Sequence, residues 1–275
     1  MRSFFAAIAA LLALLLAGVA VPAIWADRNI VQESGFVAMA SPLGSDPKFQ
    51  AALTAAASKT VFAQLNVDPA LLPIVQPIVE AATKSLTTDP GYPAAWTETL
   101  RRSHRLTVTD AGQGTGDQSG LTLDVAPLLD LVVKKVTAGV GAPVSAPPQV
   151  LISVGRADQR AAVVKLATYA PLGYWAAGAA ALALMLALVI ARRRSTTLLL
   201  VGLGLAAVAG AWKLGMDQLA KNVLDSASGN AVADLFKQQF VAASSASFGW
   251  WIVVALVVAG VMVAVGGLGR IFARS

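Results

Sequence analysis

The sequence predicts a mainly α-helical membrane protein with four transmembrane helices, an α-rich extracytoplasmic domain that contains two short strands, and an external helical hairpin between the last two spans. Three observations predict this fold class. Four apolar segments are about as long as the ~20 residues that a helix needs to cross a bilayer. Arginines mark one set of their ends, and tryptophans mark the other set.

The composition is that of a membrane protein with a sizeable polar portion. Of the 275 residues, 56% are hydrophobic and 13% are charged, whereas roughly a quarter of the residues are charged in a soluble domain. The chain has no cysteine, which excludes disulfides, cysteine-bound zinc, iron–sulfur clusters and thiol nucleophiles. We expect no cofactor.

The net charge of +6 follows from the predicted topology rather than from a surface for nucleic acid. Residues 26–170 and 213–247 each contain equal numbers of acidic and basic side chains. The whole excess therefore lies in the segments expected in the cytoplasm, on Arg2, Arg192, Arg193, Arg194, Arg270 and Arg274. Basic residues in short loops stay on the cytoplasmic side. We expect both termini inside, the main domain outside and no nucleic-acid partner.

The spans set the boundaries of the segments. Residues 1–25 are an N-terminal anchor, with a cleaved signal peptide as the alternative, although the apolar run exceeds the ~7–15 residues typical of one. Residues 171–212 form a hairpin with three arginines at its tip, and residues 248–275 hold the fourth span and a short cytoplasmic tail. The tryptophans at the predicted outer ends are Trp25, Trp175, Trp212, Trp250 and Trp251, and they form an interfacial belt.

Residues 26–170 are the predicted extracytoplasmic domain. Its first helix is expected to begin at Ser45, Asp46 and Pro47, an N-cap pair followed by proline. A second helix reaches about Thr87, and a third begins near Pro93, with Trp96, Leu100 and His104 on one face and a Glu98–Arg102 pair on another. The later elements are a strand over 121–125, a helix over 126–138 capped by Asp124, a strand over 149–154, and a helix from Asp158 that runs toward the second span.

The segment 213–247 is expected to form the external hairpin. Apolar residues recur at helical spacing from Met216 to Leu224 and again from Val232 to Phe240, and residues 226–230 separate the two helices. We expect this hairpin to pack on the extracytoplasmic domain or to lie at the lipid surface.

A few side chains are candidates for contact with a ligand or a partner: Trp96, Arg101, His104, Phe236 and Phe240. His104 is the only histidine, so a serine–histidine–acid triad would have to use it, and a metal site would have one nitrogen ligand, which is weak for zinc. Its position on a face with Trp96 and Leu100 favours a structural role. The cluster of Arg101, Arg102 and Arg105 is typical of a solvated helix face paired with acids.

Two further patterns have a structural explanation. The glycine-rich stretch 112–116 follows a predicted helix and leads into a strand, the reverse of a dinucleotide loop, so we expect no nucleotide. Small residues at a spacing of four predict close helix packing: Ala9, Ala13 and Ala17; Gly202, Ala206 and Gly210; Ala255 and Ala259; Gly260 and Ala264. A face for a partner's membrane helix is the alternative.

The chain resembles a family of uncharacterised integral membrane proteins from actinobacteria. The matching phrases are Asp46–Pro47, residues 62–68, the Trp96…Arg101…His104 spacing and residues 121–124, together with the arginine-tipped hairpin. The resemblance implies an N-terminal anchor, a helical extracytoplasmic region, a three-span C-terminal half and a place in a cell envelope. It implies no activity and no functional residue.

These observations favour a non-enzymatic plasma-membrane protein whose extracytoplasmic domain binds an envelope partner, or an accessory subunit of a larger membrane complex. No ionisable side chain lies within the predicted spans, which argues against an ion-coupled transporter. The alternative is a protein that binds or transports a lipid or small molecule in a groove between the domain and the bilayer, lined by residues such as Phe236 and Phe240. A hydrolase acting through His104 is a third hypothesis.

Overall fold

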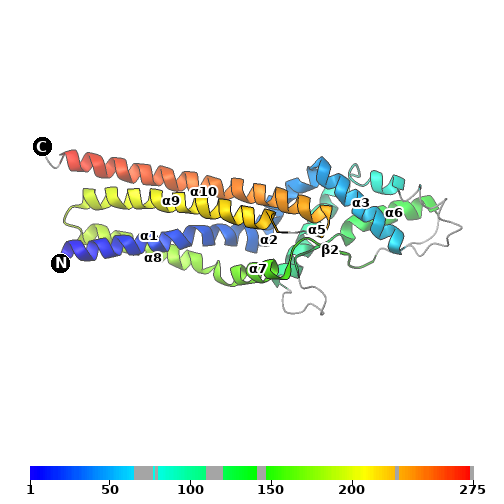
Figure 1. Ribbon diagram of the computed structural model, residues 1–275, viewed down its shortest axis with the longest axis horizontal. Helices are drawn as coiled ribbons and strands as arrows, with labels where there is room; N and C mark the ends of the chain where they lie inside the picture. Colours follow the sequence, from blue (N-terminus) through cyan, green and yellow to red (C-terminus); the bar gives the residue numbers. More distant parts are fainter. Residues whose placement is uncertain (65–76, 78–79, 110–119, 141–146, 227–228, 273–275) are drawn as a thin grey trace. The chain divides into compact units, whose positions relative to one another are not determined.

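The computed structural model describes residues 1–64, 77, 80–109, 120–140, 147–226 and 229–272. This part of the chain is mainly helical, with two short strands and four helices that are long and apolar enough to cross a membrane (Figure 1). The coarse prediction of a mainly α-helical fold with four helices of membrane-spanning length is therefore confirmed. The chain forms two compact units: Met1–Ile30, Leu166–Asp225 and Ala242–Ser275 make a membrane unit, and Val31–Lys165 with Ser226–Val241 make a polar unit.

Four helices build the membrane unit and lie side by side in Figure 1. They are α1 (Arg2–Ala26), α8 (Leu172–Ile190), α9 (Arg194–Leu224) and α10 (Ala231–Phe272), and the first residues of α10 belong to the polar unit. Their mutual contacts use small side chains, because only small residues let helix backbones approach closely. Ala6, Ala13 and Ala20 of α1 recur every seven residues and are buried.

Glycine allows the closest approaches between these helices. A Cβ atom on Gly173 of α8 would lie 2.8 Å from the Cβ of Ala23 in α1, and one on Gly202 of α9 would lie 2.8 Å from the carbonyl oxygen of Ala259 in α10. The predicted packing positions Ala13, Gly202 and Ala259 are confirmed, since all three are buried. Exposed Gly210 and Gly260 do not pack in this way: a Cβ there would meet nothing within 4 Å.

A tryptophan completes the backbone hydrogen bonding of α1. Pro22 lies inside this helix and has no N–H, so it leaves the carbonyl oxygen of Gly18, four residues earlier, without its helical donor. The indole Nε1 of Trp212 donates a hydrogen bond to that oxygen at 2.8 Å. Such replacement donors are what allow proline inside membrane helices.

Polar and aromatic contacts gather at one end of the membrane unit. Trp25 donates to the Ser247 hydroxyl at 3.1 Å, and Phe248 lies between Trp25 and Trp212, with ring centroids 5.2 and 6.2 Å away. The Tyr174 hydroxyl donates to Asp27 Oδ2 at 3.2 Å. Trp25 and Trp212 are buried, whereas Trp175 and Trp250 are 80% and 69% exposed. The predicted belt residues therefore differ in role: the buried Trp25 and Trp212 connect helices, whereas Trp175 and Trp250 are exposed.

The basic residues mark the opposite end of the same helices. The start of α9 packs against the end of α10, where a Cβ on Gly266 would lie 2.7 Å from the carbonyl oxygen of Ser195. Arg194 and Arg270 occupy these two helix ends. Figure 1 shows the start of α1, the connection between α8 and α9 and the end of α10 together at this end of the unit.

Both long helices continue past the predicted ends of their spans. We expected residues 213–247 to form a separate hairpin, but these residues extend α9 to Leu224 and α10 back to Ala231. No proline interrupts either junction, and Lys213 pairs with Asp217 one turn later at 2.5 Å. At ~1.5 Å per residue, the 42 residues of α10 extend about 63 Å, roughly twice the thickness of the hydrocarbon core.

The first helix of the polar unit lies earlier in the chain than expected. A π-helical turn, Asp27–Val31, follows α1 and leads to α2 (Glu33–Ala40) and a 3-10 turn (Ser41–Ser45). The prediction that the first helix of this region starts at Ser45–Pro47 is therefore wrong. The α3 helix (Pro47–Gln64) does start there, and Asp46 Oδ1 accepts a hydrogen bond from the Phe49 N–H at 2.8 Å. The predicted second helix lies largely outside the described residues, as does the 112–116 loop.

The remaining elements follow the predicted order. They are α5 (Tyr92–His104), a π-helical turn (Arg105–Thr109), β1 (Thr122–Asp124), α6 (Ala126–Val140), β2 (Leu151–Ser153) and α7 (Ala157–Tyr169). The two strands pair antiparallel, with Leu123 opposite Ile152. The helix predicted from Asp158 toward the second span is α7, and it does not continue into that span, because α7 ends at Tyr169 and Pro171 is the N-cap of α8.

Asp124 joins the strands to α6. Its Oδ1 atom accepts hydrogen bonds from the Ala126 N–H at 3.1 Å, as a helix cap, and from the Val150 N–H at 3.0 Å. The Ser103 hydroxyl accepts from the Asp124 N–H at 2.9 Å and donates to the Thr99 carbonyl at 2.6 Å. The core around this junction is made of α3, α5 and α6, with Phe49, Leu100, Leu128 and Val132 almost completely buried.

Candidate functional site

The predicted contact residues fall into three places in the polar unit. Trp96 packs edge-on against Phe49, with ring centroids 5.3 Å apart, and its indole N–H donates to the Ser41 carbonyl at 3.1 Å. It is only 3% exposed. Nearby, the Tyr92 hydroxyl donates to the Gly44 carbonyl at 2.9 Å, and burial raises the pKa of Tyr92 to about 12. Trp96 therefore fastens α5 to the 3-10 turn in the hydrophobic core.

Three of the other candidates meet in one aromatic row. His104, 5% exposed, lies 5.2 Å from the ring of Phe36, which lies 5.7 Å from Phe240, and Phe240 stacks on Phe236 at 5.7 Å. The row joins α5, α2 and the first turns of α10. Phe36 is the member of this row that the sequence did not indicate, because the helix that carries it was not predicted.

The predicted arginine cluster is paired with acids from two helices. Arg101 and Arg105 both pair with Glu33 of α2 at 3.7 Å, and Arg102 pairs with Glu98 at 3.1 Å. These side chains are between about a third and a half exposed. The interpretation of this cluster as a solvated helix face paired with acids agrees with these contacts. Surface pairs of this kind contribute little individually, about 0–1 kcal/mol.

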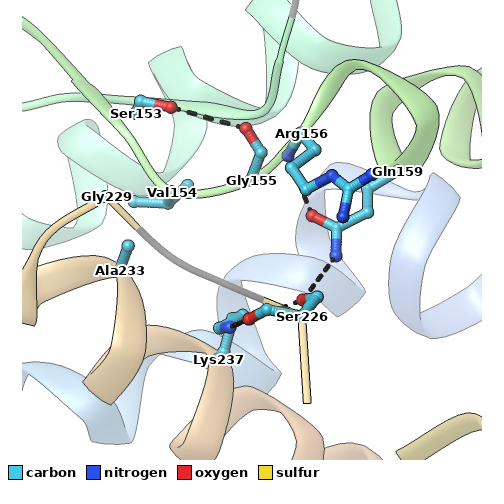
Figure 2. Close-up of a pocket in the computed structure, with 9 residues that line it drawn as sticks. All are labelled: Ser153, Val154, Gly155, Arg156, Gln159, Ser226, Gly229, Ala233 and Lys237. Atoms are coloured by element: carbon cyan, nitrogen blue, oxygen red, sulfur yellow. Dashed lines mark hydrogen bonds between the residues drawn. The ribbon is translucent and has the colours of Figure 1, made fainter. Parts of the chain in front are cut away.

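A small cavity lies in the described part of the polar unit. It has a volume of about 70 Å³ and is lined by Ser153, Val154, Gly155, Arg156, Gln159, Ser226, Gly229, Ala233 and Lys237 (Figure 2). These residues come from the end of β2, the first turn of α7, and the first turns of α10 with the residues before it. None of them was singled out by sequence reasoning, since they are far apart along the chain.

Side-chain hydrogen bonds hold the two walls of this cavity together. Gln159 Oε1 accepts from the Arg156 N–H at 2.9 Å, and its Nε2 donates to the Ser226 hydroxyl at 3.2 Å. Asn230 donates to the Ser153 carbonyl at 2.9 Å and caps α10 by accepting from the Ala233 N–H at 2.8 Å. These hydrogen bonds therefore fix the position of one wall of the cavity relative to the other.

Lys237 lies at the base of the cavity. Its side chain is 8% exposed, and its ammonium donates to the carbonyl and, at 3.4 Å, to the hydroxyl of Ser226. Figure 2 shows this contact opposite the side chains of Gln159 and Arg156. Arg156 lies at the rim, with a side chain that is 60% exposed and pairs with Asp158 at 3.2 Å.

Among the described residues, no group of three or more histidine, aspartate or glutamate side chains is placed to hold a metal ion. The fold and these sites define the class of the protein: a helical protein with four helices of membrane-spanning length and a polar unit built around α3, α5 and α6. In comparisons with known proteins, no family model, no curated protein and no solved structure matches the chain.

Proposed function

We propose that the protein is a non-enzymatic integral protein of a bacterial plasma membrane. In this proposal all four long helices span the bilayer, both termini lie in the cytoplasm, and the polar unit lies outside, where it binds an envelope partner or serves as an accessory subunit of a larger membrane complex. The resemblance to actinobacterial membrane proteins belongs to the same proposal.

The observation that carries the topology is the separation of charge and aromatic rings within the membrane unit. Arg194 and Arg270 lie at one end of the helices, and the contacts of Trp25, Trp212 and Phe248 lie at the other. The chain passes into the polar unit at Val31 and returns from it at Leu166, next to the aromatic end of α1 and α8. Because basic loops are retained inside, this separation favours an external polar unit.

Cysteine labelling tests the topology directly, since the chain has no cysteine of its own. The two variants are Lys134→Cys in α6, a side chain that is 70% exposed, and Arg193→Cys at the tip of the hairpin. A membrane-impermeant maleimide is expected to label the first in intact cells, and the second only after permeabilisation. If only the Arg193→Cys variant were labelled in intact cells, the orientation would be the opposite of the proposed one.

The packing and ion pairs of the candidate side chains support a binding function rather than a catalytic one. His104 is packed in the aromatic row, Trp96 in the core, and Arg101 faces Glu33. Phe236 and Phe240 stack on each other and pack against the same core, so we do not assign them to a lipid groove. The exposed charges of α5 and α2 remain as a surface for a protein partner.

The accessory-subunit form of the proposal is tested by co-purification in mild detergent followed by mass spectrometry. Gly260 of α10 is exposed with no atom near its Cβ position, which leaves room for the close approach of another helix. We expect Gly260→Leu to release a membrane partner, and Val257→Leu, at a site that is 61% exposed on the same helix, to retain it. Recovery of the wild-type protein without any stoichiometric partner would contradict the proposal.

A further inference from the structure

We propose that the cavity between β2, α7 and α10 binds a phosphate-type oxyanion. Its described lining includes two cationic side chains, Arg156 and Lys237, and no carboxylate. The nearest acids on these elements, Asp158 and Asp234, are 66% and 53% exposed and do not line it. Among the described lining residues, the ionised side chains are therefore these two cations, although each also has one of these carboxylates within 4 Å.

The ammonium of Lys237 has donor capacity left for an anion. It carries three N–H groups, and its hydrogen bonds go to the two oxygens of Ser226. The carboxylate of Asp234 is 3.8 Å away, which is beyond hydrogen-bond distance. An ammonium that is nine-tenths buried gains more from an oxyanion than an exposed one does, because the surroundings screen the charges less.

The size of the cavity fits a compact tetrahedral anion. A water molecule needs at least ~10–15 Å³ of such volume, so about 70 Å³ accommodates a group of a few heavy atoms. The first turns of α7 and α10 line the space through Gln159 and Ala233, and the N-terminal ends of helices favour negative charge. The hydroxyls of Ser153 and Ser226 also line the space, where the first donates to the Gly155 carbonyl and the second accepts from Gln159 and Lys237.

This inference does not rest on the proposed topology, since it concerns residues within the polar unit alone. Two sources supply the same chemistry: inorganic phosphate and the terminal phosphate of a lipid headgroup. Titration calorimetry on the full-length protein in neutral detergent and chloride buffer uses inorganic phosphate as the probe. We expect saturable one-to-one binding in the millimolar range or tighter.

Two variants connect this binding to the cavity. Arg156→Gln removes the cation at the rim and is expected to weaken phosphate binding about tenfold or more, because a charged hydrogen bond is lost. Lys165→Gln removes one positive charge from α7, the helix that Arg156 directly precedes, away from the lining, and is the matched control that should bind as the wild type does. Equal affinities of these two variants would overturn the proposal.

A second substitution keeps the proposal testable if Arg156→Gln unfolds. A Cβ on Gly229 would meet nothing within 4 Å, so Gly229→Asp places a carboxylate beside the cavity without a clash. We expect this variant to fold, by circular dichroism, and to lose phosphate binding, whereas Gly229→Asn should retain most of it. Retained binding in a folded Gly229→Asp variant, or absence of saturable binding by the wild type, would overturn the assignment.

The two sources of phosphate are separated in nanodiscs. Phosphatidic acid in the bilayer should lower the apparent affinity for inorganic phosphate if a headgroup reaches the cavity, and an all-phosphatidylcholine bilayer should not. Unchanged affinity in both bilayers supports free phosphate as the ligand. Either result is compatible with the oxyanion site, and the labelling experiment on Lys134 remains independent of both.

Discussion

The hydrogen bond from Trp212 to Gly18 gives the sharpest prediction for the membrane unit. Replacing Trp212 by phenylalanine removes the indole N–H that bonds to the Gly18 carbonyl at 2.8 Å. Because Pro22 has no N–H to offer in its place, the carbonyl oxygen is left without a donor in the packed interior. Trp212 is only 8% exposed, so water cannot easily take over the bond.

The expected cost follows from two magnitudes. An unsatisfied buried acceptor costs about 1–3 kcal/mol, while side-chain hydrogen bonds between membrane helices average about 0.6 and reach ~1.7 kcal/mol. We therefore expect Trp212→Phe to lower the free energy of unfolding by about 1–2 kcal/mol from the hydrogen bond alone. Trp175→Phe, at a position 80% exposed, should change it by less than about 0.5 kcal/mol.

A double-mutant cycle isolates the hydrogen bond from the loss of ring volume. In a Pro22→Ala background, residue 22 regains an N–H that can reach the Gly18 carbonyl along the helix, so Trp212→Phe should cost about 1 kcal/mol less than it does with proline present. Equilibrium unfolding in mixed micelles, followed by circular dichroism, measures the four free energies. An equal cost of Trp212→Phe in both backgrounds would refute the reasoning.

The remaining predictions concern other single contacts. Asp124→Ala removes the acceptor for two backbone N–H groups and should destabilise the polar unit by about 2–4 kcal/mol in thermal or chemical unfolding, whereas Asp124→Asn, which keeps an oxygen acceptor, should cost about half of that or less. Gly173→Leu should disrupt the close packing of α8 on α1, which a lowered melting temperature would show, while Gly178→Leu should be nearly neutral because its Cβ position is open. The hydrogen bonds from Lys135 and from the Gly91 N–H hold the pKa of Asp89 below its ordinary value of 3.8; the stabilisation is therefore complete above that value and is lost as the pH falls through the lower folded pKa. Melting temperatures measured against pH should fall less steeply in acid for Asp89→Asn, and an unchanged slope would exclude this linkage.

The polar residues that cap helices were predictable because capping is local. Asp46 and Asp124 were expected at helix starts from their immediate neighbours, and both accept the backbone hydrogen bonds that this role requires. The shared face of Trp96, Leu100 and His104 was likewise predictable, since helical periodicity alone places these side chains together, and all three are buried. By contrast, α2 escaped prediction, because its short, weakly patterned segment follows directly after the first span.

The sequence by itself determined the number of apolar helices of spanning length, their basic and aromatic ends, and the balance of charge in the polar segments. Hydropathy and charge are properties of continuous stretches, so no partner has to be known. Tertiary structure alone decided that Trp212 donates a hydrogen bond to the Gly18 carbonyl, which Pro22 leaves without a helical donor. It also decided that Phe36 lies between His104 and Phe240. It placed Lys237 and Arg156 in the lining of one cavity. These contacts join residues far apart along the chain, and only the packing of helices brings them within reach.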